Sequence, residues 1–298
     1  MIYDIIIIGG GTAGMTAAIY GTRAGKSVLI LEGETPGGQI VNAAHVENYP
    51  GFKSISGADF AFNLFDQAKG LGAVFAYEAV TAIGDNGDTK TVTTQQNTYT
   101  SKSIIIAAGA KNRPLGLEDE ERLTGRGISY CATCDGNFFR DKVTAVVGGG
   151  NTALEDALFL SNVCKQVYLI HRRDSFRGEQ HRVDLLREKQ NVTFLLNARV
   201  TKLFGEDQLH TIAIQQEETE KTLDIDGLFV AIGQIPQNQI FANLVDLDQG
   251  GYIIADEACR TKTKGIFAAG DCRAKTIRQL STATADGTIA ALSAAQVE

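Results

Sequence analysis

Two cysteines separated by two residues are the best candidates for redox chemistry in this sequence of 298 residues. Cys131 and Cys134 stand in the segment Cys-Ala-Thr-Cys-Asp. A C-x-x-C pair can lower the pKa of one thiol and close into a small, reducible ring. A structural zinc ion would need two more ligands at a suitable spacing, whereas Cys164, Cys259 and Cys272 are scattered along the chain. The pattern therefore favours a redox-active disulfide, with a structural zinc site or inert thiols as alternatives.

Asp135 directly follows the second cysteine. Thiol–disulfide exchange moves protons, and a carboxyl group at this position could donate or accept one. The same side chain could instead cap a helix. Both roles remain open, and Asp135 joins Cys131 and Cys134 as a candidate catalytic residue.

A glycine-rich turn near the N-terminus follows an apolar strand and opens a helix. Its residues 9–14, Gly-Gly-Gly-Thr-Ala-Gly, fit the G-x-G-x-x-G pattern. These glycines permit a tight turn, close approach of a pyrophosphate and packing of helix on strand. Glu32 ends the next strand, where a carboxylate accepts hydrogen bonds from the hydroxyls of an unphosphorylated ribose. The turn predicts a site for FAD or NAD, against the alternative of a turn made for packing alone.

A second turn, Gly-Gly-Gly-Asn-Thr-Ala at 148–153, repeats this plan in the middle of the chain. Glu32 lies 23 positions after the first glycine of its turn, and His171 lies at the same spacing in the second unit, followed by two arginines. Guanidinium groups bind phosphate through paired hydrogen bonds. The second site is therefore expected to prefer NADPH over NADH, the alternative being a solvated basic face. Two such sites in one chain predict a flavoprotein that receives a hydride from NADPH.

The elements that must position these turns occur twice, in the order strand, turn, helix, strand. A late apolar strand ends each repeat, and a last strand is inferred to return to the first domain. The predicted fold class is α/β, with two Rossmann-like, three-layer dinucleotide-binding domains. The NADPH domain, 113–240, is inserted into an FAD domain made of 1–112 and 241–298. Strands are expected at 3–8, 27–32, 104–109, 142–147, 166–171, 228–233 and 265–271, helices at 12–24 and 151–163, and small antiparallel strands within 74–99.

Composition excludes several classes of function. The net charge of −7 argues against a nucleic acid or an anionic membrane surface as the main partner. No apolar run in the sequence approaches the roughly 18 residues of a membrane span. Five cysteines with one close pair do not make a secreted disulfide scaffold. A reducing compartment, the cytoplasm, is the expected location.

The combined motifs resemble those of the low-molecular-weight, bacterial-type thioredoxin reductases. The resemblance rests on Cys-Ala-Thr-Cys-Asp-Gly at 131–136, on the second glycine turn, and on His-Arg-Arg-Asp-Ser-Phe-Arg at 171–177. It implies FAD and NADPH as cofactors, a homodimer, and thioredoxin or a thioredoxin-like small redox protein as partner. It also implies that Cys134 faces the flavin, that Cys131 attacks the partner's disulfide, and that Asp135 assists protonation.

The resemblance further implies flavin contacts at 37–39, 46–51, 270–271 and 278–280. The residues expected to contact FAD are Gly9, Gly11, Thr12, Ala13, Gly14, Glu32, Gly33, Gly38, Gln39, Asn48, Val80, Ala108, Gly109, Gly270, Asp271, Arg278, Gln279 and Leu280. Those expected to contact NADPH are Gly148, Gly150, Asn151, Thr152, Glu155, His171, Arg172, Arg173 and Arg177. No metal site is expected.

Several rival functions remain open at this point. A related flavin-dependent disulfide reductase, or a dithiol oxidase, would use a different electron acceptor. A non-catalytic nucleotide-sensing module is disfavoured by the intact C-x-x-C pair. In the favoured function, nicotinamide and disulfide share one domain and both must reach the flavin, so a hinge rotation of that domain is expected.

Overall fold

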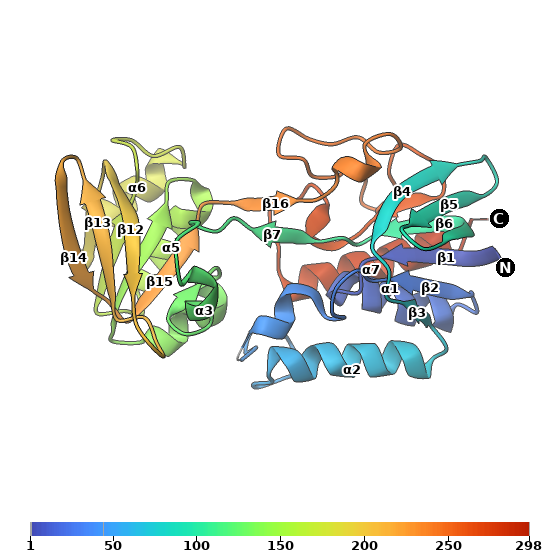
Figure 1. Ribbon diagram of the computed structural model, residues 1–298, viewed down its shortest axis with the longest axis horizontal. Coiled ribbons are helices and arrows are strands. Elements are labelled where there is room, and N and C mark those ends of the chain that lie inside the picture. Colours follow the sequence, from blue (N-terminus) through green and yellow to red (C-terminus); the bar gives the residue numbers. More distant parts are fainter. Residues whose placement is uncertain (1, 44, 298) are drawn as a thin grey trace. The chain divides into compact units, whose positions relative to one another are not determined.

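The computed structural model describes residues 2–43 and 45–297 and divides into two compact units (Figure 1). The second unit is one continuous segment, Asn112–Gln234, and the first consists of the chain before and after it. The sequence predicts 113–240 for the inserted segment. The chain passes from the first unit to the second in the short strand β7 (Ala110–Asn112) and returns in β16 (Gln234–Pro236). These two strands pair with each other.

A parallel sheet forms the middle layer of the first unit, in the order β3-β2-β1-β6 with β17 on the other side of β6. Its strands are apolar on both faces, as buried parallel strands require. Ile5 and Ile7 of β1 pack in one core, and Ile6 and Ile8 pack in the other. The strands are β1 (Ile2–Ile8), β2 (Val28–Leu31), β3 (Val74–Ala76), β6 (Thr98–Ile106) and β17 (Ile266–Ala268).

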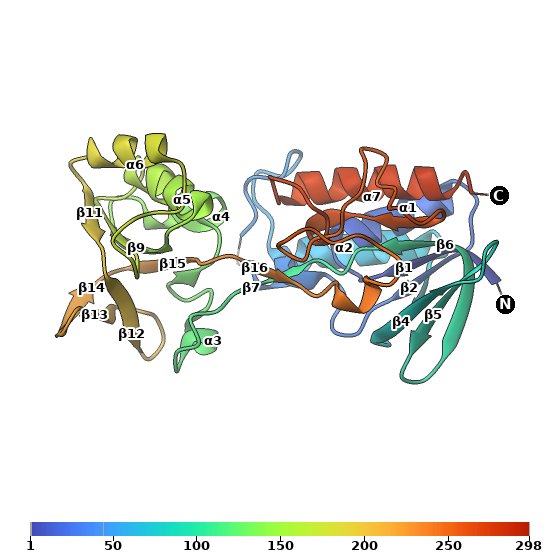
Figure 2. The same cartoon turned by 90° about the horizontal axis from the view of Figure 1, so that it is seen from above.

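Helices and antiparallel strands cover the two faces of this sheet (Figure 2). Helices α1 and α7 pack together on one face, and the hairpin β4–β5 continues from the first half of β6 on the other. The elements are α1 (Thr12–Arg23), α2 (Gly57–Gly70), β4 (Val80–Asp85), β5 (Lys90–Thr94), α7 (Leu280–Ala294) and the short helices η1 (Gly38–Asn42), η3 (Gln239–Phe241) and η4 (Gly270–Cys272).

The expectation of antiparallel strands within 74–99 is correct for β4 and β5 and wrong for β3. Strand β3 pairs in parallel with β2, with Leu29 opposite Val74. The physical reason is α2, which the sequence analysis did not predict. Parallel neighbours need a long crossover connection, and α2 supplies it.

The second unit repeats the three layers. Its parallel sheet has the order β11-β10-β9-β15-β8, with helices α4, α5 and α6 in one core and the antiparallel sheet β12-β13-β14 in the other. The strands are β8 (Ile128–Ser129), β9 (Val143–Gly148), β10 (Gln166–Ile170), β11 (Val192–Leu195), β12 (Ala198–Phe204), β13 (Thr211–Gln216), β14 (Thr219–Asp224) and β15 (Gly227–Ala231). The helices are α3 (Glu120–Leu123), α4 (Ala132–Asp135), η2 (Gly136–Phe139), α5 (Asn151–Ser161) and α6 (Gln180–Arg187).

The predicted fold class is confirmed: the protein is α/β, with two Rossmann-like units of three layers each. The strands and helices predicted around both glycine turns are present, with ends shifted by a few residues. Within the residues that the structure describes, no helix has both the length and the apolar character that crossing a membrane demands.

Candidate functional site

A cavity of about 640 Å³ opens at the carboxyl ends of the parallel strands of the first unit. Loops after β1, β2, β6 and β17 meet there because parallel strands all end at the same edge of their sheet. All residues expected to contact FAD line this cavity except Gly14, Asn48 and Arg278. The lining residues from that set are Gly9, Gly11, Thr12, Ala13, Glu32, Gly33, Gly38, Gln39, Val80, Ala108, Gly109, Gly270, Asp271, Gln279 and Leu280.

The three remaining residues support the lining rather than form it. A Cβ on Gly14 would lie 1.9 Å from the carbonyl oxygen of Gly9, so Gly14 allows α1 to pack on the turn. Asn48 donates a hydrogen bond from Nδ2 to Oε1 of Gln279 at 3.3 Å. Arg278 donates a hydrogen bond from Nε to the carbonyl oxygen of Asp271 at 3.4 Å, and its guanidinium lies 3.9 Å above the ring of Tyr252.

The first glycine turn has the shape that a pyrophosphate requires. Gly9 has a φ of +102°, and a Cβ there would lie 2.4 Å from the Ala107 carbonyl oxygen. Only glycine fits this position. The N-cap of α1 is Gly11, which has no side chain to satisfy the N–H groups of the first turn. Those groups and the helix dipole are suited to bind a phosphate.

Glu32 is fixed at the edge of the cavity by two backbone donors. Its Oε2 accepts a hydrogen bond from the N–H of Gly10 at 2.6 Å, and its Oε1 accepts one from the N–H of Glu34 at 2.8 Å. Each carboxylate oxygen retains acceptor capacity. This arrangement suits the two hydroxyls of an unphosphorylated ribose.

Asp271 supplies a buried acceptor without a partner in the lining of the cavity. Its Oδ1 is buried and has no hydrogen-bond partner among the described residues, with Lys275 Nζ 3.9 Å away. Burial raises the pKa of this carboxyl group, while Lys275 and Arg278 oppose that shift. A buried polar atom without a partner costs free energy, and a hydroxyl of a bound cofactor would relieve that cost. The cavity as a whole therefore fits FAD.

Part of the lining carries no sequence signal. Gln237, Ile240 and Phe241 come from the segment after β16, and Ala283 comes from α7. None belongs to a motif, and an apolar or neutral residue outside a motif is indistinguishable from ordinary core. Tertiary packing alone brings these residues to the cavity.

The second glycine turn repeats the geometry of the first. A Cβ on Gly148 would lie 2.4 Å from the Ala231 carbonyl oxygen, and the N-cap of α5 is Gly150. Asn151 Oδ1 accepts a hydrogen bond from the Glu179 N–H at 2.7 Å, which ties the start of α5 to the following loop. The exposed carboxylate of Glu155 pairs with Arg182. Thr152 is exposed in the first turn of α5.

His171 differs in its surroundings from the three arginines predicted with it. It is 6% exposed, stacks on Phe176 with ring centroids 5.1 Å apart, and packs against Gly149. Burial, followed by the nearby arginines, lowers the pKa of the imidazole, which favours its neutral form. Arg172, Arg173 and Arg177 are exposed beside it. The cationic groups available to a phosphate are therefore the arginines. His171 instead packs against Gly149 of the turn.

The predicted redox pair forms a disulfide in the second unit. Cys131 and Cys134 are joined, with their Cα atoms 5.3 Å apart. Cys131 is the N-cap of the short helix α4, which follows directly after β8. Both cysteines are partly exposed. The disulfide is therefore held at the end of a strand of the parallel sheet, and it is accessible to a thiol.

Ser129 links this disulfide to Asp135. Its hydroxyl donates to Asp135 Oδ2 at 2.7 Å and accepts a hydrogen bond from the Cys131 N–H at 3.1 Å. Asp135 thus lies within a hydrogen-bond network that reaches the backbone of Cys131. The sequence analysis did not select Ser129, because a lone serine in a strand carries no signal.

The other cysteines do not form a second redox centre. Cys164, Cys259 and Cys272 are free and buried. Burial raises the pKa of Cys259 to about 11 and that of Cys272 to about 12, which keeps both as unreactive thiols. In the part of the chain that the structure describes, no group of three or more His, Cys, Asp or Glu side chains could hold a metal ion.

Asp156 is a buried carboxyl group that contacts α4, the short helix with Cys131 at its N-cap (here called the dithiol helix). It lies on α5, is 8% exposed, and accepts a hydrogen bond from the backbone N–H of Ala132. Burial, with a smaller contribution from Glu155, raises the pKa of Asp156 to about 7. The pKa of an aspartate in an unfolded chain is about 3.9. A shift of one pKa unit corresponds to a free energy of about 1.4 kcal/mol. Asp156 therefore stabilises the folded state less and less as the pH rises from about 4 to 7.

Asp156→Asn is expected to stabilise the protein at pH 8, because it replaces a buried charge by a neutral group of the same shape. The expected gain in the free energy of unfolding is about 1–4 kcal/mol, and it shrinks as the pH falls toward 4. Urea unfolding at several pH values measures it. Asp184→Asn, at an exposed position of α6, is the control and should leave the pH profile unchanged. Equal profiles for Asp156→Asn and the wild type would contradict the assignment.

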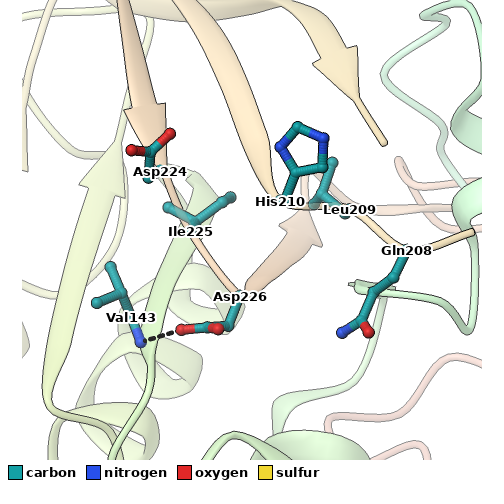
Figure 3. A pocket seen from close by; sticks show the side chains of 7 residues that line it. All are labelled: Val143, Gln208, Leu209, His210, Asp224, Ile225 and Asp226. Carbon is teal, nitrogen blue, oxygen red and sulfur yellow. Dashed lines mark hydrogen bonds between the residues drawn. The ribbon is translucent and has the colours of Figure 1, made fainter. Parts of the chain in front are cut away.

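A second cavity, of about 470 Å³, lies in the second unit and contains none of the predicted site residues (Figure 3). Asp226 Oδ2 accepts a hydrogen bond there from the N–H of Val143, the first residue of β9, at 2.9 Å. The glycine turn begins at Gly148, the last residue of β9, so this cavity lies at the opposite end of the strand. Its lining residues are Val143, Gln208, Leu209, His210, Asp224, Ile225 and Asp226.

Known proteins are similar to this chain over nearly its whole length. A thioredoxin reductase of Listeria monocytogenes is 45% identical over 292 residues, which cover 97% of this chain and 92% of the relative. A thioredoxin reductase of Bacillus subtilis is 42% identical over 295 residues, with 98% and 93% covered. The crystal structure of thioredoxin reductase from Streptococcus pyogenes superposes with a TM-score of 0.94 at 39% identity and covers 99% of this chain and 98% of that one.

The family comparison agrees with these relatives. The family described as pyridine nucleotide-disulphide oxidoreductase matches residues 3–287, a range that includes both glycine turns, the disulfide and most of α7. The chain therefore belongs to the pyridine nucleotide-disulphide oxidoreductase family.

Proposed function

We propose that this protein is a thioredoxin reductase, which carries two electrons from NADPH through FAD to the disulfide of thioredoxin. The observation that carries the proposal is the accessible Cys131–Cys134 disulfide, in the same unit as the arginine-flanked glycine turn. The cavity of the first unit fits FAD, and relatives that are 42–45% identical are named thioredoxin reductase. FAD, when bound, supplies the two-electron acceptor between nicotinamide and disulfide.

The protein's own residues perform the exchange with the partner. In the reduced state, the Cys131 thiolate attacks one sulfur of the partner's disulfide, forming a mixed disulfide and releasing one partner thiolate. Cys134 then attacks the sulfur of Cys131, restores the ring and releases the second partner thiolate. Two protons must be delivered to the released thiolates, and Asp135 is the proposed relay for them. The partner gains two electrons and two protons in each cycle.

Two nucleotide roles follow from the two turns. The first turn, with Glu32 and Asp271, is proposed to bind the pyrophosphate, ribose and ribityl parts of FAD. The second turn, with its exposed arginines, is proposed to bind NADPH through the 2′-phosphate. The second turn and the dithiol belong to one unit, and the nicotinamide held by that turn and the dithiol must both reach FAD. The expected hinge rotation is therefore part of the proposal.

The proposed setting is the cytoplasm, with the protein as a homodimer. Three buried free thiols suit a reducing compartment. The dimer is proposed from the sequence resemblance, and no role at a membrane or on a nucleic acid is proposed.

An anaerobic titration tests the function directly. NADPH should bleach the flavin absorbance of the holoenzyme, and thioredoxin disulfide added afterwards should restore it. Bleaching without reoxidation would instead support a related reductase with another acceptor. Failure of NADPH to bleach the flavin, together with rapid oxygen consumption when dithiols are added in a separate aerobic assay, would support a dithiol oxidase.

A further inference from the structure

Glu120 is a buried carboxylate near the start of the second unit. It is 4% exposed and begins the short helix α3. Its Oε1 accepts a hydrogen bond from the N–H of Leu115 at 2.8 Å, and its Oε2 accepts bonds from Gly116 at 2.8 Å and Leu117 at 3.3 Å. The carboxylate therefore holds the chain segment that enters the unit after β7.

The same carboxylate also holds the residue before the redox disulfide. The Tyr130 hydroxyl donates to Glu120 Oε1 at 2.8 Å, and Tyr130 directly precedes Cys131. On the other side of Tyr130, Ser129 binds the Cys131 N–H and Asp135. Residues 129–131 are thus fixed at the end of β8 by two separate sets of hydrogen bonds. A bond to a charged acceptor is among the stronger ones.

We infer that Glu120 and Tyr130 are positioning residues for the dithiol: they hold the backbone before Cys131 so that its sulfur remains within reach of Cys134. The inference rests on the proposed function, because only a protein that cycles between disulfide and dithiol uses this control. Neither residue touches the reacting sulfur atoms through its side chain in the contacts described above.

The physical effect acts on the reduced state. Closing a disulfide removes freedom that the two thiols have when they are apart. An anchor that already restricts the open dithiol lowers this cost and raises the effective concentration of one thiol at the other. The hydrogen bond from Tyr130 to Glu120 therefore favours the disulfide and makes the dithiol a stronger reductant. Loss of the bond shifts the equilibrium toward the dithiol.

Equilibration with glutathione measures this shift in the holoenzyme. One protein disulfide and two molecules of glutathione give one dithiol and one glutathione disulfide, with two electrons and two protons transferred. Acid quenching, alkylation of free thiols and mass spectrometry give the fraction of dithiol at each glutathione ratio. Tyr130→Phe keeps the ring and removes only the hydroxyl. We expect it to raise the equilibrium constant for reduction about threefold to tenfold.

Tyr99→Phe is the matched control. The Tyr99 hydroxyl donates to Glu78 Oε1 at the same distance of 2.8 Å, but in the first unit, between β6 and the segment that precedes β4. It should leave the constant unchanged, although its effect on the melting temperature should resemble that of Tyr130→Phe. Glu120→Gln, with a single acceptor oxygen for four donors, should shift the constant further in the same direction as Tyr130→Phe.

The possible results distinguish a failure of this inference from a failure of the proposed function. A constant for Tyr130→Phe within twofold of the wild type would overturn the inference, as would an equal shift in Tyr99→Phe. Failure of the wild type to reduce thioredoxin would contradict the proposed function instead, and the glutathione constant would still be measurable.

Discussion

Cys134→Ser is expected to reduce NADPH-driven turnover of thioredoxin by about 10³-fold or more. The variant cannot form the ring with Cys131, so electrons have no path to the partner. NADPH should still bleach the flavin, because the cavity in the first unit and the second glycine turn are unchanged. Stopped-flow flavin absorbance and a thioredoxin reduction assay measure the two steps separately.

The control for this substitution is Cys164→Ser, which makes the same atomic change at a free, buried cysteine of the second unit. It should retain turnover, with some loss of stability from placing a hydroxyl in the core. Normal thioredoxin turnover by Cys134→Ser would show that the reaction does not need the Cys131–Cys134 disulfide. Loss of flavin bleaching in Cys134→Ser would show that the cysteine acts earlier than proposed.

Replacing both Arg172 and Arg173 with alanine is expected to remove most of the preference for NADPH over NADH. Both side chains are exposed at the end of β10, beside the buried His171. A hydrogen bond to a charged group contributes about 1.5–3 kcal/mol. Losing two such groups should lower kcat/KM for NADPH by about 10²–10⁴-fold and leave the value for NADH nearly unchanged. Steady-state kinetics with both nucleotides measures the ratio.

Arg187→Ala is the control for that double variant. Arg187 is also exposed, but it lies at the end of α6 and pairs with Asp184. It should leave the ratio of the two nucleotides unchanged, because it lies outside the turn and its flanking arginines. An equal loss of activity with NADPH and NADH in the double variant would contradict a 2′-phosphate site and indicate a general disturbance of the turn.

His171 shows a limit on assigning the role of a motif residue from its type and position in the sequence. The sequence places it beside three arginines and predicts that all four residues contact NADPH. The structure buries it against Gly149 and Phe176, and this burial lowers the pKa of its imidazole. Burial is a property of the folded chain, and residue type and spacing do not report it.

The end of the inserted segment shows the same limit on a larger scale. The sequence identifies an inserted domain from the repeated strand-turn-helix pattern and from the late strand after it. The end of the insertion has no motif of its own. The structure ends the second unit at Gln234, where the sequence predicts an end at 240.

The sequence by itself determined the features that depend on neighbouring residues. Glycines at 9–14 and 148–153, the cysteines at 131 and 134, and the apolar strands before each turn act through local backbone geometry, so their pattern is visible in the chain. Tertiary structure alone decided which distant residues join them. Asp156 beneath the dithiol helix, and Glu120 bound to Tyr130, are ordinary polar residues until folding removes them from water. Desolvation then makes each hydrogen bond or charge strong enough to matter.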